Sequence, residues 1–269
     1  MKKLISILLT VMMLVPFCGA AMAENNSEGD GFTPKDVLQW LDDSDKEAQD
    51  ADGQLINGAM RLAEMLVCVD SVNANEEQNE ALQSILGRLA IAKSDESLGQ
   101  DQMFATGTIE VVEALELLAR QVDGEGKNAQ IADNLKDEFL KGNDAAPTPS
   151  DQAVNALYSA VKFAALAAEE CCPSQDMVDQ IEEGLTQVAQ DDAAASTVGE
   201  KLVVGSRWLF KMLGAFTKLQ GEEKVQSIEN LTNNTEAGVA DYGPLQAAAT
   251  WLYSSVYACG VLTGAMTVD

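Results

Sequence analysis

Histidine is absent from the 269 residues of this chain. Any mechanism that needs an imidazole base or an imidazole metal ligand is therefore excluded. Basic residues are also scarce: 17 Lys and Arg stand against 43 Asp and Glu, a formal net charge of −26. So few cations cannot form a large basic face, and we expect no nucleic acid partner. Hydrophobic residues make up 46% of the chain, which is enough for a buried core.

Recognisable catalytic motifs are also missing. The chain has no Gly-x-x-x-x-Gly-Lys-Ser/Thr loop, no Gly-x-Gly-x-x-Gly motif after a strand and no Gly-x-Ser-x-Gly motif. Acidic pairs such as Glu169-Glu170 and Glu182-Glu183 point about 100° apart on a helix, which favours exposed faces over a catalytic dyad. A cysteine nucleophile would lack a histidine partner. The sequence therefore predicts a protein that is not an enzyme, with no cofactor and no metal site.

The first twenty-three residues have the pattern of a bacterial secretory signal peptide. Met1-Lys2-Lys3 is a short positive region, Leu4 to Phe17 is mostly apolar, and Ala21-Met22-Ala23 is a small-x-small cleavage site. The apolar run is short for a membrane span, and bulky Phe17 argues against lipidation at Cys18. We therefore expect cleavage after Ala23, no stable membrane anchor afterwards, and a mature protein in the periplasm or outside the cell.

Four cysteines remain after cleavage, Cys68, Cys171, Cys172 and Cys259. In an oxidising compartment they permit two disulfides with three pairings. Direct pairing of Cys171 with Cys172 requires a strained ring, so a bond from one of them to Cys68 is favoured. Buried, unpaired thiols at helix ends are the alternative.

Helical periodicity covers almost the whole chain, and no period-2 run bounded by turns is present. Thr33-Pro34 is typical of a helix start, and Asn75 with Gln78 resembles a capping box. The expected fold is an all-α multi-helix bundle. Its predicted helices span about 33–41, 53–71, 75–93, 101–122, 127–140, 151–170, 175–190, 197–219, 222–232 and 244–263.

The composition also suggests boundaries. An acidic, partly mobile segment is expected over 24–53, and a linker with two prolines over 142–150 separates helical units at 54–141 and 151–269. The Gly124-Glu125-Gly126-Lys127 stretch resembles Gly221-Glu222-Glu223-Lys224, 97 residues later. This weak duplication would make two four-helix units plus a C-terminal helix.

The last predicted helix has an unusual composition, because no charged residue lies between Asp241 and Asp269. Three interpretations compete for it. It is a buried central helix, a membrane-associated tail, or a surface for a ligand or protein partner formed by Trp251, Tyr253 and Tyr257. Polar residues along the helix argue against contact with lipid.

The acidic run from Asp42 to Asp52 invites a comparison with a calcium loop. If Gly53 takes the sixth position, the first and twelfth positions fall on Ala48 and Ala59, which cannot ligate through their side chains. A solvated acidic face is therefore the favoured interpretation.

These observations predict an exported, non-catalytic helical protein that binds or scaffolds through its helix faces. One alternative is a periplasmic carrier that holds an apolar small molecule between helices. A further alternative is a calcium-dependent surface protein.

Overall fold

The computed structural model describes residues 32–48, 50–124 and 126–268. These residues form ten α-helices and no strand, which confirms the all-α prediction. The predicted signal peptide and the first part of the acidic segment, residues 24–31, lie outside the described residues.

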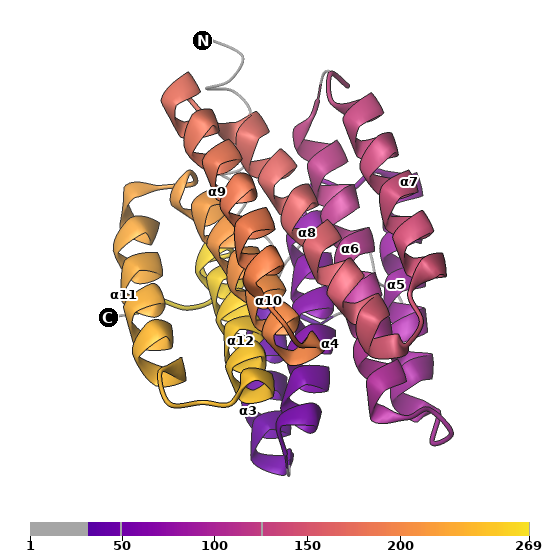
Figure 1. Ribbon diagram of the computed structural model, residues 1–269. Coiled ribbons are helices and arrows are strands. Elements are labelled where there is room, and N and C mark those ends of the chain that lie inside the picture. Colours follow the sequence, from indigo (N-terminus) through magenta and orange to yellow (C-terminus); the bar gives the residue numbers. More distant parts are fainter. Residues whose placement is uncertain (1–31, 49, 125, 269) are drawn as a thin grey trace.

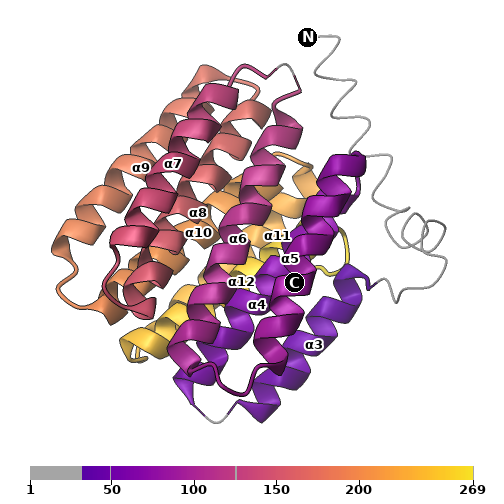
Figure 2. The same ribbon diagram turned by 90° about the vertical axis from the view of Figure 1, so that its right-hand side faces the viewer.

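The helices follow one another as hairpins in two layers (Figures 1 and 2). They are α3 (Pro34–Glu47), α4 (Ala51–Ser71), α5 (Glu76–Ser94), α6 (Gln100–Val122), α7 (Ala129–Ala145), α8 (Pro149–Cys171), α9 (Gln175–Ala194), α10 (Val198–Lys218), α11 (Glu222–Val239) and α12 (Pro244–Leu262). The even-numbered helices form a closed ring, because each packs against the next and α12 returns to pack against α4. The odd-numbered helices lie outside this ring and run back between successive inner helices.

The inner helices are parallel and nearly in register, since they begin at residues 51, 100, 149, 198 and 244. Glycines recur at equivalent positions: Gly58, Gly107 and Gly205. A Cβ atom added to Gly58 would lie 2.9 Å from Leu252 Cβ, and one added to Gly107 would lie 3.1 Å from Ala59 Cβ. One added to Gly205 would lie 2.8 Å from Leu157 Cβ. Each glycine thus lets its helix approach the preceding helix of the ring closely.

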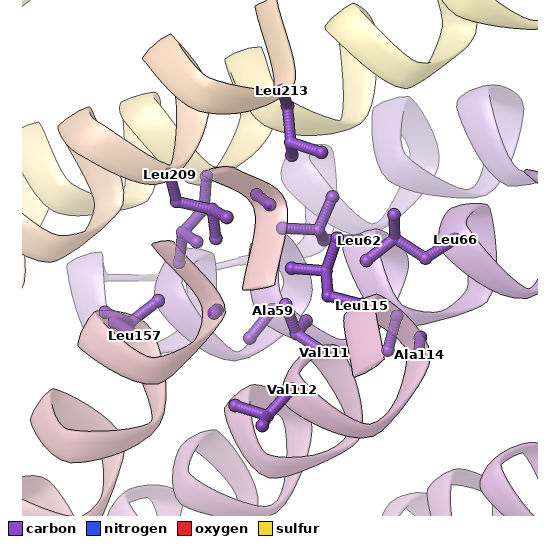
Figure 3. Close-up of a cluster of buried hydrophobic side chains, with 14 of the residues drawn as sticks. Ala59, Leu62, Leu66, Val111, Val112, Ala114, Leu115, Leu157, Leu209 and Leu213 are labelled. Atoms are coloured by element: carbon purple, nitrogen blue, oxygen red, sulfur yellow. The ribbon is translucent and has the colours of Figure 1, made fainter. Parts of the chain in front are cut away.

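The centre of the ring is filled with apolar side chains. One turn of the inner helices contributes Leu62, Val111, Ala160 and Leu209, and the next contributes Leu66, Leu115, Ala164 and Leu213; all are at most 1% exposed. Figure 3 shows leucine, valine and alanine side chains from α4, α6, α8 and α10 meeting there. The ring therefore encloses a packed core and not an open channel.

Ion pairs help to attach outer helices to the ring. Arg88 of α5 donates to both carboxylate oxygens of Glu110 of α6, at 2.6 Å each. Lys136 of α7 lies 2.9 Å from Glu116 of α6. Glu110 and Glu116 are both buried, so these cations compensate buried carboxylates on the ring; Glu116 is also paired with Arg120 of its own helix.

The structure differs from the predicted division into two units. Residues 142–145 belong to α7 and residues 149–150 to α8, so only a three-residue turn remains of the predicted linker. The two predicted halves share one ring, because α6 packs against α8 and α12 packs against α4. The internal duplication is not confirmed; the repeating structural unit is a helix hairpin, and the 97-residue shift is close to two hairpin lengths.

The uncharged C-terminal helix is one of the five inner helices. Thirteen residues of α12 are buried, including Trp251. Of the three interpretations of this helix, the structure therefore agrees with the buried central helix. Within the described part of the chain, no helix combines the length and the apolar character that a membrane span requires.

Candidate functional site

A hollow of about 470 Å³ lies between α10, α11 and α12. Small-molecule sites in proteins have volumes of about 300 to 1,000 Å³, so its size suits a small ligand. We call it the α10–α12 hollow. Its lining residues are Glu200, Val203, Arg207, Glu236, Val239, Tyr242, Pro244, Ala247 and Trp251.

The hollow is elongated because two parallel helices form its long walls. On α10 the lining residues are 200, 203 and 207, and on α12 they are 244, 247 and 251, so both walls span eight residues, or about 10 Å. The α11 helix runs in the opposite direction, because Thr235 contacts Ser254 at 2.7 Å and the earlier residue Lys224 contacts the later residue Leu262 at 2.8 Å. One end of the hollow therefore lies beside Glu200 and Tyr242, and the inner end lies beside Arg207, Glu236 and Trp251.

Trp251 lies at the inner end of the hollow as a rigid, almost fully buried side chain. Its side chain is only 2% exposed, and its ring packs on Phe210 with the centroids 5.3 Å apart. Val203, Val239 and Ala247 add further apolar surface. An apolar ligand would therefore contact walls that are already ordered, which lowers the entropic cost of binding.

Arg207 is held in place from the side of α9. Its Nη2 donates to Asp191 Oδ2, which also accepts a 2.8 Å hydrogen bond from Trp208 Nε1. The Nε of Arg207 is buried and has no hydrogen-bond partner among the described residues. The salt bridge to Asp191 thus orders the guanidinium group at the hollow, while its Nε is shielded from solvent.

The two glutamates at the hollow differ in their surroundings. Glu200 accepts hydrogen bonds from the backbone N–H groups of Ser196 and Thr197, which lower the pKa of its carboxyl. The exposed Glu236 accepts no hydrogen bond and forms no salt bridge within the described chain. Glu200 therefore belongs to the start of α10, whereas the charge of Glu236 acts on the ammonium of Lys211.

The predicted surface of Trp251, Tyr253 and Tyr257 does not form. Trp251 faces the hollow, but Tyr253 packs against Gly58 of α4 and the hydroxyl of Tyr257 donates to Asp42 of α3 at 3.3 Å. Burial, with help from Asp42, raises the pKa of Tyr257 to about 12. Trp251 and Tyr253 lie on different sides of α12 because residues two apart on a helix point in nearly opposite directions.

No disulfide joins Cys68, Cys171, Cys172 and Cys259 in the structure, so the predicted bond to Cys68 is not found. The physical reason is the ring order, since α6 lies between α4, which carries Cys68, and α8, which carries Cys171. Burial raises the pKa of both Cys171 and Cys259 to about 12. These thiols therefore stay protonated at neutral pH.

Asp70, near the C-terminal end of α4, is a buried acid that the sequence-based predictions do not include. Its side chain is 0% exposed, and neither carboxylate oxygen has a hydrogen-bond partner within the described residues. Burial raises the pKa of this carboxyl well above its usual value. The signal was present, because Asp70 follows Leu62 and Leu66 on the inward stripe of the helix.

The acidic run considered for calcium is divided between two helices. Asp42, Asp43 and Asp45 lie on α3, and Asp50 caps α4 by accepting the N–H of Gly53 at 2.9 Å. Across residues 32–48, 50–124 and 126–268, no group of three or more Cys, Asp or Glu side chains is arranged to hold a metal ion.

A smaller hollow of about 170 Å³ lies where the inner helices begin. All five contribute lining residues, among them Asp52, Asp101, Ser150, Gly199 and Leu245. Its size is below the usual range of ligand sites, so the α10–α12 hollow is the stronger candidate.

Comparison with known proteins finds no matching family model, no matching curated protein and no matching solved structure.

Proposed function

We propose that the protein is an exported, non-catalytic binding protein that holds a small organic molecule in the α10–α12 hollow. The observation that carries this proposal is the hollow itself, with its parallel walls and the ordered surface of Trp251 at its inner end. This supports the carrier alternative more than scaffolding through a flat helix face. The hollow is bordered by charged residues, so the ligand would keep part of its surface near polar groups.

Export is supported by the pattern from Met1 to Ala23. The expected mature protein begins at Glu24. N-terminal sequencing of protein isolated from its own source tests this directly. A retained Met1 on the secreted protein, or its recovery from the cytoplasm alone, would contradict export.

Binding is tested by filling the hollow. Ala247→Leu adds three carbon atoms to a residue that lines one wall, and Val239→Trp fills the hollow from the opposite wall. Ala237→Leu is the matched control, because Ala237 is exposed on α11 and does not line the hollow. We expect both filling variants to lose binding of the neutral fluorescent dye phenylnaphthylamine, and the control to bind it like the wild type.

The variants must also be shown to fold. Urea unfolding with an unchanged slope would establish that a filling variant keeps the native compactness. Equal dye binding by the wild type, both filling variants and the control would refute the proposed site. A stoichiometric organic ligand seen by native mass spectrometry of the source protein, and absent from Ala247→Leu, would support it.

A further inference from the structure

The outer end of the α10–α12 hollow, where α10 and α12 begin, brings a carboxylate and an aromatic ring together. Glu200 of α10 and Tyr242, in the turn before α12, both line the hollow there, next to the ring of Pro244. Glu200 is exposed and Tyr242 is 44% exposed, so a bound molecule can reach both side chains. A carboxylate and the face of an aromatic ring each attract a cation.

Glu200 carries a charge that no cation of the described chain neutralises. It forms no salt bridge there, and the basic residues nearest to it in sequence, Lys201 and Arg207, pair with carboxylates of α9. Its Oε2 atom accepts two backbone N–H groups, which lower the pKa of the carboxyl and keep it ionised at neutral pH. A carboxylate has about four lone pairs, so these two hydrogen bonds leave acceptor capacity for a ligand.

The helix ends at this point do not cancel the charge of Glu200. The positive end of a helix dipole corresponds to about half an elementary charge, so the full charge of Glu200 outweighs that of α10. The start of α12 and the end of α11 meet there, and their dipole charges have opposite signs. The last turn of α11 also contains no basic residue. The outer end of the hollow is therefore negative.

The rest of the hollow offers no free cation to an anionic ligand. Arg207, the one basic residue that lines the described hollow, is salt-bridged to Asp191. Glu236 adds a second negative charge, which acts on the ammonium of Lys211. The formal net charge of −26 repels anions over a longer range as well. The hollow thus favours a cation at its outer end and an apolar group further in.

We propose that the ligand is a hydrophobic amine, whose ammonium lies between Glu200 and Tyr242 and whose hydrocarbon part lies along the walls formed by α10 and α12. This inference rests on the proposed function and names the chemical class of its ligand. Val203 and Ala247 are each three residues further along their helices than Glu200 and Pro244, so they face the first part of the hydrocarbon. The walls continue for about 10 Å, which suits an extended alkyl chain.

The test compares three probes that share one alkyl chain and differ only in their head group: octylamine, octanol and octanoate. Isothermal titration of the full mature protein measures the affinity of each. We expect octylamine to bind roughly five- to twenty-fold more tightly than octanol, the combined effect of an exposed ion pair and an exposed cation–π contact. Octanoate should bind more weakly than octanol, because its carboxylate faces Glu200. Added salt should reduce the advantage of octylamine over octanol.

The variant Glu200→Gln tests the contact with the ammonium. Glutamine accepts the backbone N–H at the equivalent positions of α5 and α6, in Gln78 and Gln102, so this variant keeps the start of α10. It should bind octylamine roughly two- to five-fold less tightly than the wild type and bind octanol equally well. Asp36→Asn is the matched control, because it removes the charge of the capping carboxylate of α3, which does not line the hollow. This control should bind both probes as the wild type does.

The variant Tyr242→Leu tests the aromatic ring. It keeps an apolar side chain at the same position, and should weaken octylamine binding roughly two- to five-fold while octanol binding stays nearly the same. Equal affinity of this variant and the wild type for octylamine would overturn the cation–π contact.

The two proposals fail in different ways. If the dye and octanol bind and Ala247→Leu blocks them, while octylamine binds no more tightly than octanol, the hollow is a binding site and the amine assignment is overturned. Octylamine binding that Ala247→Leu leaves unchanged would place the amine elsewhere on the acidic surface and would overturn the assignment too. Equal affinity of Glu200→Gln and wild type for octylamine would overturn the role of Glu200. If the dye, octanol and octylamine all fail to bind, the proposed function itself fails.

Discussion

Replacing the buried carboxyl of Asp70 with an amide should remove a pH-dependent loss of stability. Asp70 is 0% exposed and its oxygens have no hydrogen-bond partner in the described chain, so burial raises the pKa of its carboxyl well above the usual value. In the unfolded chain the same group ionises above about pH 4. Because the folded-state pKa is raised, the contribution of the Asp70 carboxyl to the free energy of unfolding is fully present at low pH and is lost as the pH rises.

The size of the effect follows from proton linkage. Between the unfolded and folded pKa values, the unfolded state binds one proton fewer, so wild-type stability falls by about 1.4 kcal/mol per pH unit from this group. Asp70→Asn cannot ionise and keeps nearly the same shape. The stability of the variant minus that of the wild type should therefore be small near pH 4 and grow by about 1.4 kcal/mol per pH unit above it. The difference becomes constant above the folded pKa.

Urea unfolding at a series of pH values measures this difference. All other carboxyl groups are common to both proteins, so their titration cancels to a first approximation. Asp137→Asn is the control, because Asp137 is exposed on α7 and its change should produce no comparable pH-dependent difference. Parallel stability curves for Asp70→Asn and wild type would refute the reasoning, since they would mean that Asp70 titrates alike in both states.

Three further predictions follow from packing and charge. Gly205→Ala should destabilise the protein, because the new Cβ would lie 2.8 Å from Leu157 Cβ. Gly87→Ala, whose new Cβ would have no atom within 4 Å, should stabilise it by up to about 1 kcal/mol. Thermal unfolding measures both variants, and equal shifts of the unfolding temperature would contradict the close approach of α10 to α8. Cys259 is buried, and its pKa is raised to about 12. Ellman's reagent should therefore not modify this thiol in the native protein at neutral pH, but should modify it after unfolding. Rapid labelling of Cys259 in the native protein, mapped by mass spectrometry, would contradict its burial. Because the formal charge is −26, unfolding temperatures should be higher at moderate than at very low ionic strength, and a temperature independent of salt would show that self-repulsion is minor.

The individual helices were largely predictable because their signals are local. The expected helix over 244–263 corresponds to α12 at Pro244–Leu262, and the capping box of Asn75 and Gln78 is present at the start of α5. Helix α3 extends beyond the predicted end at Leu41 to Glu47, and its added turn is held by hydrogen bonds from Asn57 and Arg61 of α4 to Ser44. Local patterns thus located elements well and their ends less well.

The closure of the ring was not predictable from helix periodicity. Periodicity shows that a helix has an apolar side, but it does not show which helix covers that side. The glycines Gly58, Gly107 and Gly205 recur at a multiple of 49 residues and mark the close contacts between inner helices. The sequence spacing of these glycines does not by itself indicate contacts between helices, because those contacts depend on the register of the inner helices.

The candidate site was even less accessible from the sequence. The uncharged C-terminal helix draws attention to Trp251, but Arg207 and Glu236 lie on two other helices and carry no motif. The tyrosines grouped with Trp251 face α3 and α4 instead. The hollow results from the packing of three helices around small and apolar residues, and that packing is a property of the tertiary structure.

The proposal that the hollow binds a ligand is tested most directly at Trp251. The chain has three tryptophans, so the indole N–H signals in a two-dimensional NMR spectrum are few and can be assigned by substitution. Titration with phenylnaphthylamine should shift the Trp251 signal saturably and leave the signal of Trp40 on α3 unchanged. An unmoved Trp251 signal at a saturating concentration of the dye would contradict binding in the hollow.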